Sequence, residues 1–195
     1  INDQSFRMSL AHSIPISDPS WKVTSMLATL KGTRLEETKH MTMIDASQRS
    51  LKKIGRSKHA LEEKRTADSA YWLLSSSIDF AEIILTRSNL PLSPSHIVPL
   101  MQNASELGFA EEYQHWVEAS CLSIATKVSV KRRFTGLVAV LGSLREAGRP
   151  PMTGEDPGKL ISKRYEFLHS RSQPLSAFGY LGVEIVKAIE SMYRL

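Results

Sequence analysis

Apolar residues recur at intervals of three and four along residues 57–88, and this pattern is the strongest constraint on the fold. The spacing places these residues on one face of a helix. Trp72 and Phe80 widen the apolar stripe, so we expect a long helix that is covered on more than one side. The stripe consists of Ala70, Leu73, Leu74, Ser77, Ile78, Ala81, Ile84 and Leu85.

The rest of the chain shows shorter helical patterns, and no alternation of period two is long enough for a strand. Gly55 is the expected end of one helix, and Ser95 is the expected cap of another. We predict an all-α protein, a helical bundle of about six to eight helices. An irregular arm is expected over residues 1–20 and a single α-helical domain over residues 21–195. The shorter helices are expected at residues 21–31, 33–54, 95–107, 109–127, 130–147, 159–169 and 174–193.

Composition limits the kinds of site that the chain can form. A hydrophobic content of 42% is enough for a core without disulfides or metals. Cys121 is the only cysteine, which excludes an intrachain disulfide and a cysteine-based zinc site. A thiol packed within an apolar helix is its expected state. The HExxH, P-loop, GxGxxG and GxSxG patterns are absent, and we expect neither a metal nor a cofactor.

Hydropathy and net charge limit the kinds of partner that the chain can have. No apolar run reaches the length of a membrane span, and no basic segment precedes an apolar one as in a secretory leader. We therefore expect a cytoplasmic protein without a membrane partner. Lysine and arginine number 25 against 20 acidic residues, which gives a net charge of +5 and permits nucleic acid as a partner.

Basic residues gather in three clusters. Each cluster could contact phosphates, because neutralised phosphates release counterions. The alternative is that they are solvated helix faces and helix ends. The residues that we expect to bind nucleic acid are Lys131, Arg132, Arg133, Lys163 and Arg171. The full clusters are Arg49, Lys52, Lys53, Arg56, Lys58, Lys64 and Arg65; Lys127, Lys131, Arg132 and Arg133; and Lys159, Lys163, Arg164 and Arg171.

Arg164 and His169 are the candidate catalytic pair. They follow a loop rich in proline and glycine at residues 148–158. In an RNA-cleaving site, a guanidinium neutralises the scissile phosphate and an imidazole moves a proton, with no metal. Positions five apart on a helix point about 140° away from each other, so a helix start or a partner chain would have to bring them onto one phosphate. Arg7 and His12 have the same spacing.

Two other polar residues have structural interpretations. Asp79 lies between Ile78 and Phe80, where a structural salt bridge is more common than a catalytic or metal-binding role. His96 follows Pro94 and Ser95, which favours capping or hydrogen bonding within a turn.

Two segments resemble the HEPN family, the helical domains found in prokaryotic toxins and beside minimal nucleotidyltransferases. AYWLLSSSIDFAEIILTRSNLPLSPSH is similar to that family's central helix and the turn after it. RYEFLHSRSQPLSAFGYLGVEIVKAIESMYRL is similar to its arginine-histidine element and closing helix, with Tyr165 where many members carry asparagine. The resemblance implies a bundle of four or five helices, often a dimer that pairs two Arg/His sites. Some members cleave RNA, and others are inactive partners or helical substrate-binding domains.

The leading interpretation is a helical module that binds nucleic acid or a nucleotide, as a metal-independent ribonuclease or without catalysis, and as a homodimer. Arg164 and His169 would form its functional centre, with Lys163 and Arg171 on the phosphates. Two alternatives stay open. One is the C-terminal helical substrate-binding part of a nucleotidyltransferase, and the other is a plain α-helical interaction domain.

Overall fold

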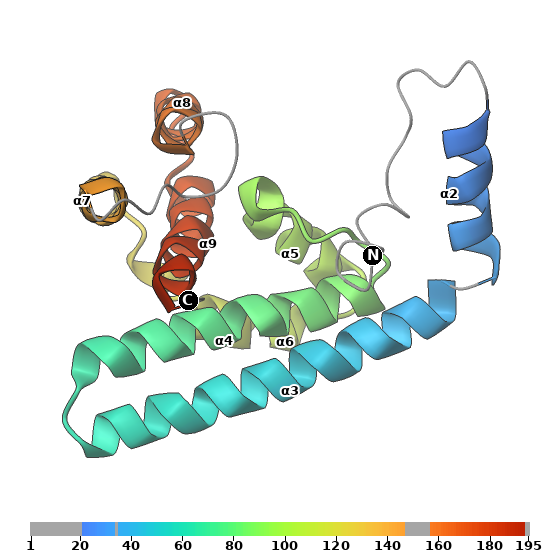
Figure 1. Ribbon diagram of the computed structural model, residues 1–195, viewed down its shortest axis with the longest axis horizontal. Helices are drawn as coiled ribbons and strands as arrows, with labels where there is room; N and C mark the ends of the chain where they lie inside the picture. Colours follow the sequence, from blue (N-terminus) through green and yellow to red (C-terminus); the bar gives the residue numbers. More distant parts are fainter. Residues whose placement is uncertain (1–20, 34, 147–156, 194–195) are drawn as a thin grey trace.

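The computed structural model describes residues 21–33, 35–146 and 157–193, and in them the chain consists of helices joined by short turns and loops (Figure 1). No strand occurs in this part of the chain, so the predicted all-α class is confirmed. The expected irregular arm over residues 1–20 lies outside the described residues. The α-helices are α2 (Lys22–Thr33), α3 (Leu35–Glu62), α4 (Thr66–Arg87), α5 (Ile97–Glu106), α6 (Ala110–Ala119), α7 (Lys127–Glu146), α8 (Pro157–Ser170) and α9 (Pro174–Tyr193), with 3-10 turns η1 (Pro94–His96) and η2 (Leu122–Ile124).

The hydrophobic core lies around α9, which contacts α4, α5, α7 and α8. Helices α4 to α9 all contribute buried side chains to this core. Glycine at position 179 allows α5 to approach closely, because a Cβ there would lie 2.6 Å from Val98 Cγ2. The largest fully buried side chains of the core include Leu85, Ile97, Met101, Trp116, Leu137, Leu168 and Leu181.

Helices α3 and α4 form a long antiparallel hairpin along one side of the molecule (Figure 1). The residues that α3 buries are small, which allows the two helix axes to approach each other. Hydroxyl groups between the helices satisfy one another: Ser50 Oγ lies 2.9 Å from Ser76 Oγ, and Ser57 Oγ donates to the main-chain oxygen of Ser69. The buried residues of α3 are Thr38, Thr42, Ala46, Ser50, Ser57 and Ala60.

The predicted helix break at Gly55 is wrong. Helix α3 continues through Gly55 to Glu62, and the turn to α4 comes at Lys64, whose φ is +61°. A glycine in a helix costs about 1 kcal/mol relative to alanine. Beyond the glycine, Ser57 and Ala60 are buried and Ser57 hydrogen-bonds Ser69 of α4, which offsets this cost. The helix expected from residue 57 to residue 88 is therefore the end of α3, a turn and α4.

The helix predicted over residues 109–127 is also interrupted. Helix α6 ends at Ala119, and Cys121 adopts a left-handed conformation with φ +56°. Leu122 enters the core, whereas Cys121 is exposed and is not the packed thiol that the sequence predicted. Helix α7 then begins with reciprocal capping, in which Thr126 N donates to Ser129 Oγ and Ser129 N donates to Thr126 Oγ1.

Candidate functional site

Arg164 connects α8 to the turn before α5. Its Nη2 donates to the main-chain oxygen of Ser95 at 2.9 Å and lies 3.4 Å from His96 Nε2. His96 Nδ1 lies 3.1 Å from the hydroxyls of Ser93 and Ser95, so its predicted role in turn hydrogen bonding is confirmed. The predicted cap is wrong, because no side chain caps the start of α5. Arg164 thus has a structural contact that its place in the sequence did not indicate.

His169 lies near the end of α8 and is exposed. Its ring packs edge-on against Tyr165, and Tyr165 stacks on Phe134 of α7 at a centroid distance of 4.1 Å. Within the described residues, no contact joins His169 to Arg164. Bringing both side chains onto one phosphate would require the expected homodimer or a rearrangement of Arg164. The ribonuclease hypothesis and the homodimer both stay predictions.

Arg133 faces the interior of the bundle, although the sequence analysis grouped it with the phosphate contacts. Its Nη1 donates to the main-chain oxygen of Phe178 at 2.9 Å, and its guanidinium carbon lies 3.4 Å from the Phe178 ring centroid. Burial lowers the pKa of Arg133 to about 10. The sequence held a signal for this orientation, because Arg133 shares helical spacing with the buried residues Val130 and Leu137.

Four exposed residues follow one another at intervals of four along the outer side of α8. They are Lys159, Lys163, Phe167 and Arg171, and we call them the α8 stripe. The Phe167 ring is 43% exposed, and the guanidinium carbon of Arg171 lies 4.5 Å from its centroid. Arg171 follows the last residue of α8, but its N–H still donates to Phe167 O, so the helical spacing continues.

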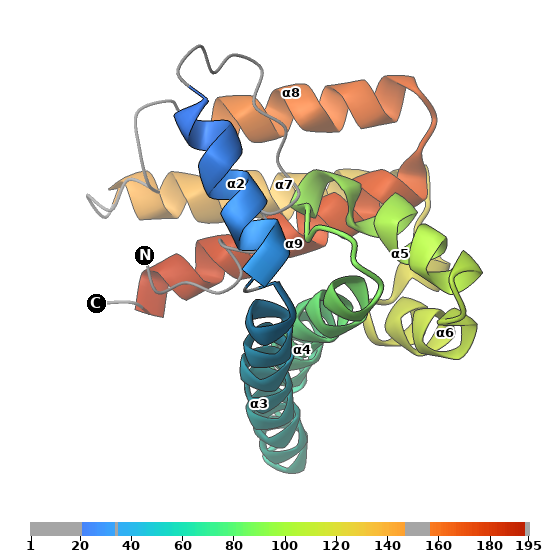
Figure 2. The same cartoon turned by 90° about the vertical axis from the view of Figure 1, so that its right-hand side faces the viewer.

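Two of the three basic clusters lie on adjacent antiparallel helices. Phe134 stacks on Tyr165, and Lys127 at the start of α7 lines a small hollow together with His169 at the end of α8. Lys131 and Arg132 are exposed on α7, next to the helix that carries the α8 stripe. The first cluster lies on and just after α3, on the opposite side of the molecule from α8 (Figure 2). The three clusters therefore do not form one surface.

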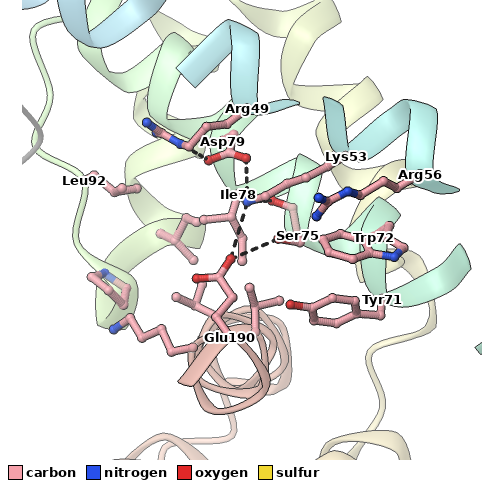
Figure 3. Close-up of a pocket in the computed structure, with 15 residues that line it drawn as sticks. Arg49, Lys53, Arg56, Tyr71, Trp72, Ser75, Ile78, Asp79, Leu92 and Glu190 are labelled. Carbon is pink, nitrogen blue, oxygen red and sulfur yellow. Dashed lines mark hydrogen bonds and ion pairs between the residues drawn. The ribbon is translucent and has the colours of Figure 1, made fainter. Parts of the chain in front are cut away.

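A pocket of about 740 Å³ lies between the α3–α4 hairpin, α9 and the segment at residues 92–97 (Figure 3). Apolar side chains make up much of its lining, and charged side chains from α3, α4 and α9 line the rest. The sequence gives no sign of this pocket, because its lining comes from segments up to about 140 residues apart. The lining residues are Arg49, Lys53, Arg56, Tyr71, Trp72, Ser75, Ile78, Asp79, Leu92, Pro94, Ile97, Val183, Val186, Lys187 and Glu190.

Ion pairs across three helices form one wall of this pocket (Figure 3). Arg49 binds Asp79 through Nε at 2.9 Å and Glu82 through Nη2 at 2.5 Å. Lys53 Nζ lies 2.7 Å from Asp79 Oδ2 and 3.6 Å from Glu190 Oε1. The structural salt bridge predicted for Asp79 is confirmed. Burial by itself lowers the pKa of Arg49, but the carboxylates of Asp79 and Glu82 outweigh it and hold that pKa above its usual value.

The geometry described above is our basis for identifying a functional site, because the comparisons with known proteins point to none. Protein families, curated proteins and solved structures were compared with the chain, and none matches it. In the part of the chain that the structure describes, no group of three His, Cys, Asp or Glu side chains is placed to hold a metal ion. Across the same residues, no helix combines the length and the apolar content that a membrane span needs.

Proposed function

We propose that this protein is a helical module that binds single-stranded nucleic acid along the α8 stripe. The observation that carries the proposal is the row of Lys159, Lys163, Phe167 and Arg171, in which an exposed aromatic ring lies between cations. Such a row combines the two features that sequence-tolerant binding of a single strand uses, which are positive charge along the backbone and a ring on which a base can stack.

The spacing of the stripe suits an extended strand. Four residues of a helix rise about 6 Å, which is comparable to the step between successive phosphates of a stretched single strand. Lys159 and Lys163 would contact neighbouring phosphates, and Arg171 would contact one beyond the stacked base. Phe167 would supply the stacking face, with Arg171 adding a cation–π contribution.

Within the part of the chain that the structure describes, no ion pair neutralises these cations. No carboxylate pairs with Lys159, Lys163 or Arg171 among the described residues, whereas Lys53 on α3 has acidic partners. Helix α7 adds further positive charge at the surface, with four exposed basic residues against one acid, Glu146. An unneutralised basic surface releases counterions when it binds phosphates, so the binding must weaken as salt rises.

RNA cleavage would require more than binding along the α8 stripe. It would require Arg164 and His169 on one phosphate, and Arg164 is engaged with Ser95 O within the protomer. Binding through the α8 stripe does not require His169, whereas Arg164 lies beside the stripe, with its guanidinium carbon 5.2 Å from the Phe167 ring centroid.

The test is a titration of a fluorescent single-stranded oligonucleotide at two salt concentrations. We expect Lys163→Ala with Arg171→Ala to weaken binding about tenfold or more, and to reduce the slope of log K against log salt by about 1.4, since each lost phosphate contact removes about 0.7. Phe167→Ala should weaken binding without changing the slope, because stacking releases no counterions.

The matched control is Lys52→Ala with Lys58→Ala, which removes two exposed lysines from α3. This variant has the same net charge change but leaves the α8 stripe intact. Binding that is insensitive to salt, or an equal loss in the control variant, would contradict the proposal.

A further inference from the structure

We infer that the pocket between the α3–α4 hairpin and α9 binds a small organic anion with a flat aromatic body. None of its lining residues belongs to α8, so this site is separate from the α8 stripe and does not rest on nucleic-acid binding. Its volume, its apolar floor, its aromatic end and its charge distribution each contribute to the inference.

The size and the floor suit a small molecule. Pockets for such ligands have volumes of about 300 to 1,000 Å³ and are lined mainly by apolar side chains. This pocket has a volume of about 740 Å³. Its aliphatic side chains come from α4, the 92–97 segment and α9, namely Ile78, Leu92, Ile97, Val183 and Val186. An apolar body inside it would be removed from water on several sides.

One end of the pocket is aromatic. Tyr71 and Trp72 lie with their ring centroids 4.9 Å apart and their planes at 62°, and both line the pocket (Figure 3). A third ring placed between this pair and the aliphatic side chains can make edge or offset contacts, which aromatic rings prefer. A flat body therefore fits this end better than a flexible chain.

The charge in the pocket favours an anion. Asp79 is engaged by Arg49 and Lys53, and Lys53 also approaches Glu190. Arg56 is different, because its guanidinium carbon lies 4.5 Å from the Trp72 ring centroid and no carboxylate pairs with it among the described residues.

Lys187 adds a second positive charge to the lining. Among the described residues its ion-pair partner is Glu184 on its own helix, and the Lys187 side chain is 54% exposed. A carboxylate, sulfonate or phosphate on the ligand would meet Arg56 beside the aromatic pair, where a guanidinium can donate two parallel hydrogen bonds.

A matched pair of dyes tests the class of ligand. 8-Anilino-1-naphthalenesulfonate carries a flat apolar body and a negative charge, and N-phenyl-1-naphthylamine has the same body without the charge. We expect the sulfonate to bind about tenfold more tightly, as one charge-assisted contact would give. Arg56→Gln should abolish this difference by weakening only the sulfonate, and Lys58→Gln on the same helix should leave it unchanged.

Two pocket-filling variants, Leu92→Trp and Ile78→Trp, locate the dye. We expect both to lose binding of the two dyes while their circular dichroism and melting temperature stay those of the parent. The Lys163→Ala, Arg171→Ala variant should bind the dyes normally, which separates this site from the nucleic-acid surface. Dye binding that persists in both folded Trp variants would overturn the site.

Two further results decide whether the ligand is flat and whether it is an anion. Displacement of the dye by 2-naphthoate but not by decanoate supports a flat body, and the reverse result overturns it. Equal affinity for the two dyes, or an Arg56→Gln variant that binds the sulfonate like the parent, overturns the anion class.

Discussion

Arg164 Nη2 donates a hydrogen bond of 2.9 Å to the main-chain oxygen of Ser95, which ties α8 to the turn before α5. We expect Arg164→Ala to lower the free energy of unfolding by about 1.5 to 3 kcal/mol, because a hydrogen bond from a charged donor is lost. Denaturation in urea measures this change.

His169→Ala is the matched control for that prediction. His169 is exposed at the end of the same helix, and its loss should cost less than about 1 kcal/mol. Equal destabilisation by the two variants would contradict the structural role of Arg164. Incubation of RNA with EDTA gives the independent readout: cleavage that disappears in a stable His169→Ala variant would support the ribonuclease hypothesis.

Asp79 is expected to be a major contributor to stability, because its side chain is 7% exposed and its carboxylate is bound by Arg49 and Lys53. Asp79→Ala would remove the carboxylate that Arg49 and Lys53 share, leaving Arg49 to Glu82 and Lys53 to the more distant Glu190, and should cost about 3 kcal/mol. Asp68→Ala is the control, since Asp68 pairs with Arg65 in an exposed position where loss of an ion pair costs at most about 1 kcal/mol. Similar urea midpoints for the two variants would refute the importance of the buried network.

Gly179 is expected to be required where α9 passes α5. Alanine at this position would gain about 1 kcal/mol of helix propensity. Its Cβ would lie 2.6 Å from Val98 Cγ2, however, and overpacking against a stiff valine side chain costs about 1 to 3 kcal/mol. We therefore expect Gly179→Ala to lower the melting temperature.

Gly136→Ala on α7 is the control for the same substitution without a neighbour. Apart from its chain neighbours and the backbone of its own helix, nothing lies within 4 Å of the added Cβ, so this variant should be more stable by up to about 1 kcal/mol. Val98→Ala should rescue part of the loss in the Gly179→Ala background. A Gly179→Ala variant as stable as the Gly136→Ala variant would mean that the close contact does not exist.

The phenol of Tyr180 is expected to lose its proton at a higher pH than an exposed tyrosine does. Burial, with a smaller contribution from Glu184, raises the pKa of Tyr180 to about 12. Below pH 10 the phenol is neutral in both the folded and the unfolded chain, so it adds no pH dependence there. Between about pH 10 and pH 12 the unfolded chain loses this proton first, so the free energy of unfolding falls as the pH rises.

Ultraviolet absorbance of the phenolates measures this titration. The protein has five tyrosines, and its titration curve should include one transition at high pH. This transition should be missing from the curve of Tyr180→Phe. The variant should also lose stability less steeply above pH 10. A parent curve identical in shape to that of Tyr180→Phe would contradict the burial of this phenol.

Much of the helical pattern could be predicted because it is local. The three-and-four spacing from Ala70 to Leu85 identifies α4, and Pro157 and Pro174 stand at the first residues of α8 and α9, where proline is tolerated. The two helices whose ends were wrongly predicted have tertiary causes for the difference. Packing against α4 carries α3 through Gly55, and burial of Leu122 accompanies the break in the helix at Cys121.

The two candidate sites differ in the same respect, because one depends on local spacing and the other on the packing of distant helices. The α8 stripe follows from the spacing of residues within one helix, and the sequence already contained it. The sequence alone determined that this protein is helical and where most of its basic residues gather, because helix geometry relates residues only a few positions apart. The tertiary structure decided that Arg164 meets Ser95, that Arg133 faces the core, and that Lys53 meets Asp79 and Glu190 beside a pocket. Those contacts depend on how distant helices pack, which no local spacing specifies.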